Sequence, residues 1–444
     1  MKAPHKTTIP KYPDMKRLFL LSITLMILLV PDALAQEQNN TFGISFKGFV
    51  KNDFFWDTRQ VTTAREGHFL LWPAPVMPDA NGVDVNAQPS FNFLAVQSRL
   101  SGVITGPDAF GAKTSGLLEG DFFAQQNDNI NLFRLRHAFI KLNWEHTELL
   151  TGQYWNPLFV TGCFPGTISF NTGTPIQSFS RNPQIRITRQ IGPISIMAAA
   201  LAQRDFSSRG PDPNDPSVTA VSSEYLRNAH VPDMHFQVHF ATSDEQGIVE
   251  SLLIGSGVAY KNIVPRLKSD WLLNTYAVDE KVHGITTILF TKIVTAPFTG
   301  KLQGRYGENI PDLLSLSGFA VKEIVDFTTG EQSYTPLRNL SAWGEIHSNG
   351  SRFQAGLFAG VTKNIGTKDP MSSPGNRVYG LGTNIESLIR IAPRLLIISG
   401  RTRIGAEVEF TGARYGSDYD ENYIAGEIVE VTNTRLLMSM MYSF

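Results

Sequence analysis

The side chains best suited to chemistry in this sequence are charged residues that alternate with apolar residues along extended segments. A guanidinium group offers a planar fork that matches a carboxylate or phosphate, and rings of Arg and Lys in a pore favour anions. We predict that the charged face lines an aqueous path and binds small hydrophilic, anionic solutes such as dicarboxylates. The alternative is that these charges only form the solvated wall that any water-filled barrel requires. The predicted pore-lining residues are Lys47, Arg99, Glu119, Asp121, Arg134, Arg136, Arg186, Arg305, Arg401, Arg403 and Arg435, and the same parity adds Asp53, Lys301, Glu345, Glu407 and Glu409.

Catalytic and metal-binding patterns are missing from the sequence. The nine histidines show no HExxH or other metal-ligand spacing, and the chain contains no G-x-S-x-G elbow and no phosphate-binding P-loop. Cys163 is the single cysteine, which excludes an intramolecular disulfide framework and a cysteine-based metal site. We therefore expect no enzymatic activity, no cofactor and no metal.

The elements that must position the charges are β-strands, and the last fifty residues show them best. Leu396, Ile398, Ile404, Ala406, Val408 and Phe410 share one parity, with Arg401, Arg403, Glu407 and Glu409 on the other. A strand points successive side chains to opposite faces, so one face is apolar and the other charged. A second alternating strand ends on Phe444, and we expect a short turn before the pair at Ala392-Pro393. A barrel-closing strand of this kind is predicted to contact the barrel-assembly machinery through Phe444.

The whole chain repeats this pattern, with short turns alternating with long loops. We predict an all-β fold, a transmembrane antiparallel β-barrel of sixteen strands, with eighteen as the alternative. Residues 36–444 form this barrel, with inward or lid loops near 155–181 and 307–339. We assign Leu267 to Lys281 to a loop, because counting it as a strand gives an odd number. Ile310 to Val325 has helix-like spacing. His137 falls on the apolar side of its strand, and we interpret it as a barrel-rim or subunit-contact position.

The N-terminus predicts export. Lys16-Arg17 precede an apolar run from Leu18 to Val30 and the A-x-A site Ala33-Leu34-Ala35, which together form a secretory signal peptide within residues 1–35. Met15 is the preferred start. No other run approaches the ~18 apolar residues of a membrane-spanning helix, so the mature chain is either soluble beyond the inner membrane or crosses the outer membrane as strands.

Composition and charge narrow the class of protein further. The chain has 444 residues, 42% of them hydrophobic, and a mean hydropathy of -0.10, which fits a barrel whose lipid-facing and lumen-facing residues cancel in any window. Removing residues 1–35 takes away five of the 39 basic and two of the 40 acidic residues, which leaves a slightly acidic chain. A nucleic-acid partner is therefore not expected. The predicted location is the outer membrane of a Gram-negative cell, in contact with its lipid.

Short motifs add a resemblance to a known family. The segments Phe133-Arg134-Leu135-Arg136-His137-Ala138-Phe139 and Thr151-Gly152-Gln153-Tyr154-Trp155, with Tyr306-Gly307-Glu308-Asn309 leading into Asp312-Leu313-Leu314, resemble DcaP-like trimeric outer-membrane porins of the Bacteroidetes type. The resemblance implies a sixteen-stranded homotrimer that admits small anionic solutes through an Arg-lined constriction, to which Arg134 and Arg136 contribute. The competing hypothesis is an occluded structural or adhesive barrel that binds a partner through its long outer loops.

Overall fold

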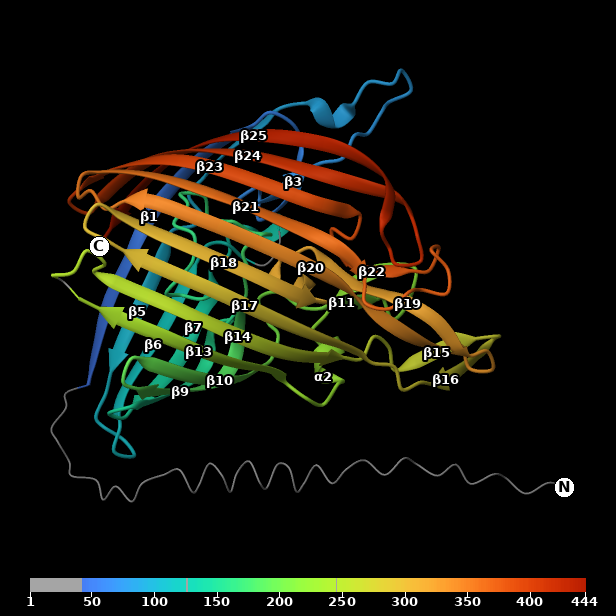
Figure 1. The fold of residues 1–444 in the computed structure, drawn as a ribbon, viewed down its shortest axis with the longest axis horizontal. Helices are drawn as coiled ribbons and strands as arrows, with labels where there is room; N and C mark the ends of the chain where they lie inside the picture. Colours follow the sequence, from blue (N-terminus) through green and yellow to red (C-terminus); the bar gives the residue numbers. More distant parts are fainter. Residues whose placement is uncertain (1–41, 125–126, 245) are drawn as a thin grey trace.

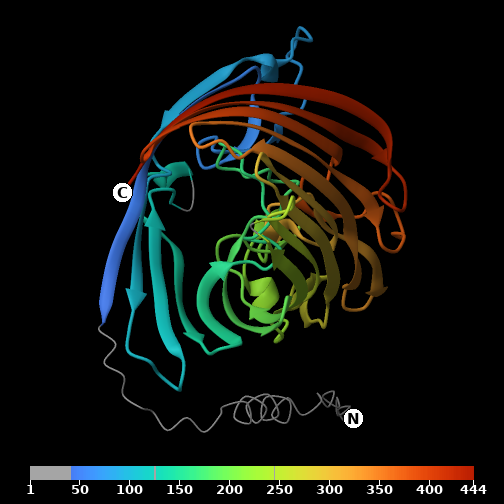
Figure 2. The ribbon, with the colours of Figure 1, turned by 60° about the vertical axis from the view of Figure 1, so that its left-hand side comes forward.

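A closed ring of antiparallel strands makes up most of the molecule. The computed structural model describes residues 42–124, 127–244 and 246–444, so the predicted signal peptide lies outside the described residues. Figures 1 and 2 show the strands wrapping around a central space that is partly filled by chain. The strands of the ring are β1 (Gly43–Asp57), β4 (Ser90–Leu94) continued by β5 (Arg99–Thr105), β6 (Lys113–Asp121), β7 (Arg134–Asn143), β8 (Thr147–Trp155), β9 (Arg181–Ile191), β10 (Ile194–Leu201), β13 (Asp233–Ser243), β14 (Ser251–Ile263), β17 (Val282–Val294), β18 (Phe298–Glu308), β20 (Glu331–Ser348), β21 (Phe353–Thr367), β23 (Ile385–Ser399), β24 (Thr402–Tyr419) and β25 (Ala425–Ser443).

The first and last strands close the ring. β25 pairs with β1 in a register that sets Phe54 opposite Met438, and the backbone of Phe444 exchanges two hydrogen bonds with Gly48, of 3.0 and 3.2 Å. The structure is a closed antiparallel barrel of 16 strands, which confirms the predicted fold class and strand number. In the described residues, no helix is long and apolar enough to cross a membrane.

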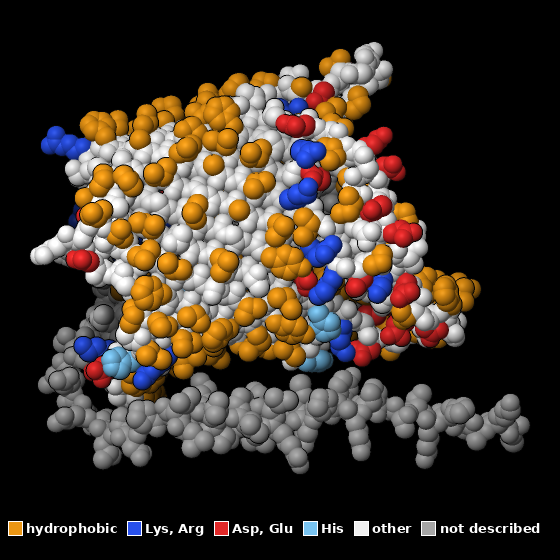
Figure 3. All heavy atoms as spheres, in the orientation of Figure 1, with side chains coloured by type: hydrophobic (Ala, Val, Ile, Leu, Met, Phe, Trp, Pro, Cys, Tyr) orange, Lys and Arg blue, Asp and Glu red, His pale blue; other side chains and the backbone are white. Residues whose placement is uncertain are grey.

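The outer face of the ring is apolar. Figure 3 shows hydrophobic side chains spread over the strands, with charged side chains gathered toward one end. Leu289 and Leu302, from the middle of neighbouring strands, are 67% and 59% exposed, whereas charged residues such as Glu345 and Glu407 are buried inside. An exposed apolar band of this extent would be unstable in water and matches the hydrocarbon of a membrane.

The predicted turn at Ala392-Pro393 is wrong, because β23 runs through it without a break. Pro393 pairs with Leu357 of β21, while the ladder to β24 skips Ala392 and Pro393. Proline has no N–H to donate, so it interrupts one ladder and leaves the other intact. The real turn is Gly400-Arg401, between Ser399 and Thr402.

Two of the long outer segments also differ from their predictions. The helix predicted over Ile310 to Val325 is wrong, since the segment forms a 3₁₀ turn at Pro311–Leu313 and then β19 (Ser317–Asp326), which pairs with β20 and β22 (Val378–Leu381). Its apolar spacing reflects burial of Leu313, Leu314 and Leu316 in the interior. Residues 267–281 lie outside the barrel wall, as predicted, but form the hairpin β15 (Lys268–Trp271) and β16 (Asn274–Ala277). The remaining elements are β2 (Val61–Ala64), β3 (Phe69–Pro73), β11 (Arg209–Pro211), β12 (Thr219–Val221), α2 (Glu224–Arg227) and two 3₁₀ turns, Val85–Ala87 and Asn127–Asn129.

Candidate functional site

The first inward loop, residues 156–180 between β8 and β9, lies inside the barrel and is hydrogen-bonded to acidic side chains of the wall. Gly166 N–H donates to Glu345 Oε2 at 2.8 Å. Ile168 and Ser169 donate their N–H groups to the two oxygens of Glu407 at 2.8 and 3.1 Å. The Asn171 side chain donates to Glu409 at 2.9 Å. These buried carboxylates, which belong to the predicted inner face, therefore anchor the loop rather than meeting bulk water.

Arginines of the wall hold the other side of the same loop. Arg305 donates to Ser178 Oγ at 2.6 Å, and Arg390 donates to the carbonyl of Thr174 at 2.6 Å. Hydrogen bonds that involve a charged group are stronger than neutral ones, so the loop is fixed at both faces. Cys163 is buried within it, with Sγ 3.3 Å from the carbonyl of Thr291.

A second segment that the sequence did not predict also enters the lumen. In the hairpin of β2 and β3, all five residues of β3 are buried, and Arg390 donates to the carbonyls of Leu70 and Leu71 at 2.8 and 3.0 Å. Phe69 packs edge-on against Phe170 and Phe179 of the first loop, at ring-centroid distances of 4.9 and 5.0 Å. The two inward segments therefore share an apolar core inside the barrel, and this core narrows the lumen.

Most of the predicted pore-lining residues form buried ion pairs. Asp121 accepts from Arg134 at 2.8 Å and from Arg136 at 2.9 Å, and Arg136 also donates to Glu119 at 2.9 Å. Arg181, which the sequence did not single out, completes the network through Asp205 at 2.6 Å. Charges removed from water must be paired in this way.

The remaining predicted residues are spread over the barrel. Arg435 is bidentate to Asp57, at 3.0 and 2.7 Å. Arg186 donates to the carbonyl of Trp155 at 2.8 Å, and Arg305 contacts the first loop as described. Lys47 is exposed on β1 close to the end where the chain enters the barrel, and Arg401 lies in the hairpin turn after β23. The structure therefore does not bring the predicted set together in one place.

His137 lies in the lumen, and the predicted rim or subunit-contact position is wrong. The register between β6 and β7 shifts between Glu119 and Gly120, so that Arg136 and His137 both face inward. His137 is 4% exposed, and its ring packs 5.4 Å from those of Tyr154 and Trp155. A β-bulge adds one residue to a strand and shifts its side chains by one position, which a strict count by parity cannot anticipate.

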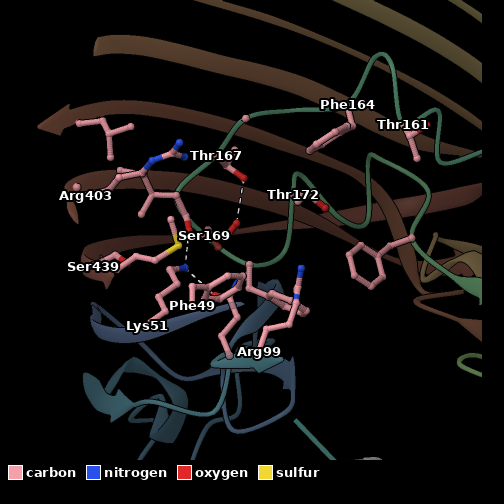
Figure 4. A pocket seen from close by; sticks show the side chains of 18 of the residues that line it. Phe49, Lys51, Arg99, Thr161, Phe164, Thr167, Ser169, Thr172, Arg403 and Ser439 are labelled. Atoms are coloured by element: carbon pink, nitrogen blue, oxygen red, sulfur yellow. Dashed lines mark hydrogen bonds between the residues drawn. The ribbon is translucent and has the colours of Figure 1, made fainter. Parts of the chain in front are cut away.

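One cavity of about 730 Å³ lies between the first inward loop and the wall. Figure 4 shows Lys51, Arg99 and Arg403 around it, opposite Thr167 and Ser169 of the loop. Arg394 also lines it, with aromatic rings that include Phe49 and Trp155. Glu119 is the one carboxylate among its lining residues. The cavity is thus bounded by four cations and one acid.

The four cations differ in how far they are neutralised. Lys51 lies 3.1 Å from Asp53, and Arg394 is paired with Glu345. Arg99 stands 3.6 Å from Glu119, a carboxylate that it shares with Arg136. Arg403 is exposed, and none of the described residues supplies it with a carboxylate partner. Arg403 is therefore the cation most available to a solute.

Sequence reasoning found Arg99 and Arg403 but missed Arg394. Because a turn was predicted at Ala392-Pro393, Arg394 was not part of a predicted strand and was not assigned to the inner or the outer face. In the continuous strand β23, Arg390 and Arg394 share the inward parity with Leu396 and Ile398. The predicted placement of Leu396 and Ile398 on the apolar outer face is therefore wrong, and Leu395 and Ile397 are the exposed residues there. Among the described residues, no group of three or more His, Cys, Asp or Glu side chains could hold a metal ion.

Comparison with known proteins rests on the fold. No protein-family profile matches the chain, and no curated protein sequence matches it. The crystal structure of the outer membrane channel DcaP of Acinetobacter baumannii matches with a TM-score of 0.62 and 15% identity, over 93% of this chain and 100% of that chain. An anion-selective porin from Comamonas acidovorans matches with a TM-score of 0.51 and 12% identity, over 91% of this chain and 100% of that chain. The outer-membrane expressed OmpT of Vibrio cholerae matches at 0.50 and 8% identity, over 92% and 100%.

These likenesses show that the chain has the porin fold. They confirm, at the level of the fold, the resemblance to DcaP-like porins that the sequence motifs predicted.

Proposed function

We propose that this protein is a porin of the Gram-negative outer membrane, through which small hydrophilic anions of the dicarboxylate type diffuse passively. Arg403 carries the proposal, because it is an exposed guanidinium at the edge of a cavity that already holds Lys51, Arg99 and Arg394. A mobile anion can neutralise the excess positive charge of these four side chains. The apolar outer belt and the neighbours' own description as outer-membrane proteins support the location.

Selection would combine size and charge. The first inward loop and the hairpin of β2 and β3 reduce the free cross-section, so only small solutes pass. Aromatic rings such as Phe49 and Trp155 flank the cations at the cavity. The Arg99 guanidinium lies 5.0 Å from the ring of Phe49, which holds the cation in place without neutralising it. A homotrimer is part of the proposal, because the DcaP-like porins that the sequence motifs resemble are trimeric.

Ion selectivity in planar bilayers tests the proposal. We expect Arg403→Gln to lower the ratio of anion to cation permeability by roughly fivefold, because a unit charge about 4 Å away in water contributes about 1 kcal/mol. Arg99→Gln should act in the same direction. Arg189→Gln is the matched control, since Arg189 is exposed on β9 and donates to Thr147 on the outer side of the wall. Unchanged selectivity in Arg403→Gln would refute the role of this cavity.

The second candidate is the occluded barrel that binds a partner through its outer loops. The shared apolar core of the two inward segments is the observation that favours it. Single-channel recording separates the two hypotheses. A porin gives discrete conductance steps in a lipid bilayer, whereas an occluded barrel gives none although it is folded and inserted.

A further inference from the structure

A row of side chains that is polar except at Leu340 crosses the outer face of the barrel at one level. Strand pairing aligns Tyr306, Leu340, Lys363, Ser387 and Arg414 on consecutive strands from β18 to β24. Figure 3 shows Lys and Arg side chains gathered along the edge of the apolar surface. This edge is the end at which the long segments connect the strands, opposite the short turns and the C-terminus. The row therefore marks the extracellular boundary of the lipid-facing belt.

The row carries more positive than negative charge over β20 and β21. Lys363 and Arg414 share the carboxylate of Glu386, at 2.7 and 3.2 Å, and their side chains are 52% and 47% exposed. Arg338 donates to the carbonyl of Ile365 at 3.1 Å. Glu308 lies opposite Arg338 in the register and is paired with Lys368 at 3.2 Å. Glu430 stands opposite Arg414 in the register and offsets it. The four cations Arg338, Lys363, Lys368 and Arg414 thus stand against three carboxylates, those of Glu308, Glu386 and Glu430, which leaves an excess of one positive charge in the patch around Arg338 and Lys363.

An apolar groove of about 790 Å³ begins at the next outward-facing position, two residues further along the same strands. The next aligned set below Lys363 is Gly304, Ala342 and Val361, and the following set is Leu302, Gly344 and Ala359. The small residues form the floor, and larger side chains such as Leu289 and Ile389 stand at the sides. A Cβ placed on Gly304 would have no heavy atom within 4 Å, so the groove is open.

A cationic rim continuous with a hydrocarbon-sized groove has the form of a lipid site. We propose that Lys363 and Arg338 bind a phosphate of a phosphorylated glycolipid of the lipid A type, and that one acyl chain of the same molecule lies in the groove of Gly304, Gly344 and Ala359. The inference rests on the outer-membrane location in the proposed function and is independent of what the lumen conducts. The leaflet at this level of a Gram-negative outer membrane consists of such glycolipids. A cation near a membrane surface contributes about 1 kcal/mol toward an anionic headgroup.

Native mass spectrometry of the detergent-purified full chain, titrated with bisphosphorylated lipid A, tests the headgroup contact. We expect Arg338→Gln combined with Lys363→Gln to weaken binding by roughly fivefold for each cation removed. Arg189→Gln, which removes an outer-face cation near the opposite end of β9, should bind as the unchanged protein does. Dephosphorylated lipid A and phosphatidylglycerol are the comparison ligands. Equal binding of either one would show that a lipid A phosphate is not what the site recognises, and would overturn the proposal.

A second variant tests the groove itself. In Gly304→Leu the new side chain fills the floor of the groove, and its Cβ has no other heavy atom within 4 Å. The substitution should weaken lipid A binding by roughly fourfold for each acyl-chain methylene group that it displaces from the groove. Gly102→Leu is the matched control, because a Cβ there makes ordinary contacts of 3.6 Å with Ile44 and Phe46 on a distant strand. Binding unchanged in Gly304→Leu, or weakened equally in both variants, would also overturn the proposal. Bilayer conductance of the same samples reports on the proposed porin function separately, since none of these residues lines the lumen.

Discussion

Guanidinium groups in the lumen serve two different purposes. Arg134, Arg136 and Arg181 are buried against Asp121, Asp205 and Glu119, and such a network fixes the strands and the inward loop relative to one another. Arg403 has no such partner among the described residues and faces the cavity. Removing one member of a buried pair leaves an uncompensated charge and is costly, whereas removing an exposed cation mainly changes the local potential. Substitutions in the first group should therefore affect stability, and those in the second should affect selectivity.

Asp205 gives a test of the buried group that depends on pH. Burial favours a higher pKa for Asp205, but Arg181, Arg134 and Arg65 outweigh it and lower the pKa from 3.8 to about 2. The carboxylate therefore stabilises the fold at any pH above its unfolded pKa, by about 2 kcal/mol, and this contribution disappears as the pH falls toward about 2.

We expect Asp205→Asn to unfold at a lower temperature than the unchanged protein at pH 7, when both are followed by circular dichroism in detergent. The difference should shrink between about pH 4 and pH 2. A difference that is the same at pH 7 and pH 2.5 would show that the charge on Asp205 is not what stabilises the protein.

At the scale of elements, the first inward loop depends on Glu407 for its position. Replacing one carboxylate oxygen by an amide N–H group, as in Glu407→Gln, sets a donor against the N–H of Ile168 or Ser169. The loss of one hydrogen bond to a charged group costs about 2 kcal/mol, which raises the population of detached loop roughly thirtyfold. We expect single-channel records to show more frequent transitions and a higher mean conductance. Glu427→Gln on the exposed part of β25 is the control, and records identical to the control would exclude an anchoring role for Glu407.

The strands could be predicted from the sequence, and the paths of the inward segments could not. One face of each strand meets lipid and the other meets polar groups, so apolar and polar residues alternate along the sequence. In β24 the apolar residues are Ile404, Ala406, Val408 and Phe410, and the charged residues are Arg403, Glu407 and Glu409. All five residues of β3 are buried, so this strand shows no alternation of apolar and polar residues. Pro393 suggested a turn because its effect on one ladder cannot be separated from the end of a strand in the sequence. His137 was assigned to the wrong face because the alternation of apolar and polar residues does not reveal a β-bulge.

At the scale of the whole molecule, the site is a consequence of ring closure. β1 brings Lys51, β5 brings Arg99, and β23 and β24 bring Arg394 and Arg403, although more than three hundred positions of the chain separate Lys51 from Arg394. The pairing of β25 with β1 places the first strands beside the last ones. The sequence predicted the seam, from the alternation that ends at Phe444, and so it predicted that distant cations face one lumen. It did not predict which of them meet, because that depends on the partners each one finds.

A barrel that spans the membrane must turn its apolar outer belt toward hydrocarbon, and a substitution at Leu289 tests this orientation. Leu289 lies near the middle of β17 and is 67% exposed, so an arginine fits there without a steric clash. Its effect on the free energy of unfolding therefore depends on whether the side chain meets lipid or water. A charged side chain on the lipid face near the midplane costs about 2–4 kcal/mol, and much less near the interface. We expect Leu289→Arg to lower the urea midpoint for unfolding from phospholipid vesicles well below that of Leu289→Ala, which removes the same apolar contacts without adding a charge. If the two variants unfold at the same urea concentration, Leu289 faces water or protein, and the orientation of every strand in the barrel would have to be reversed or shifted.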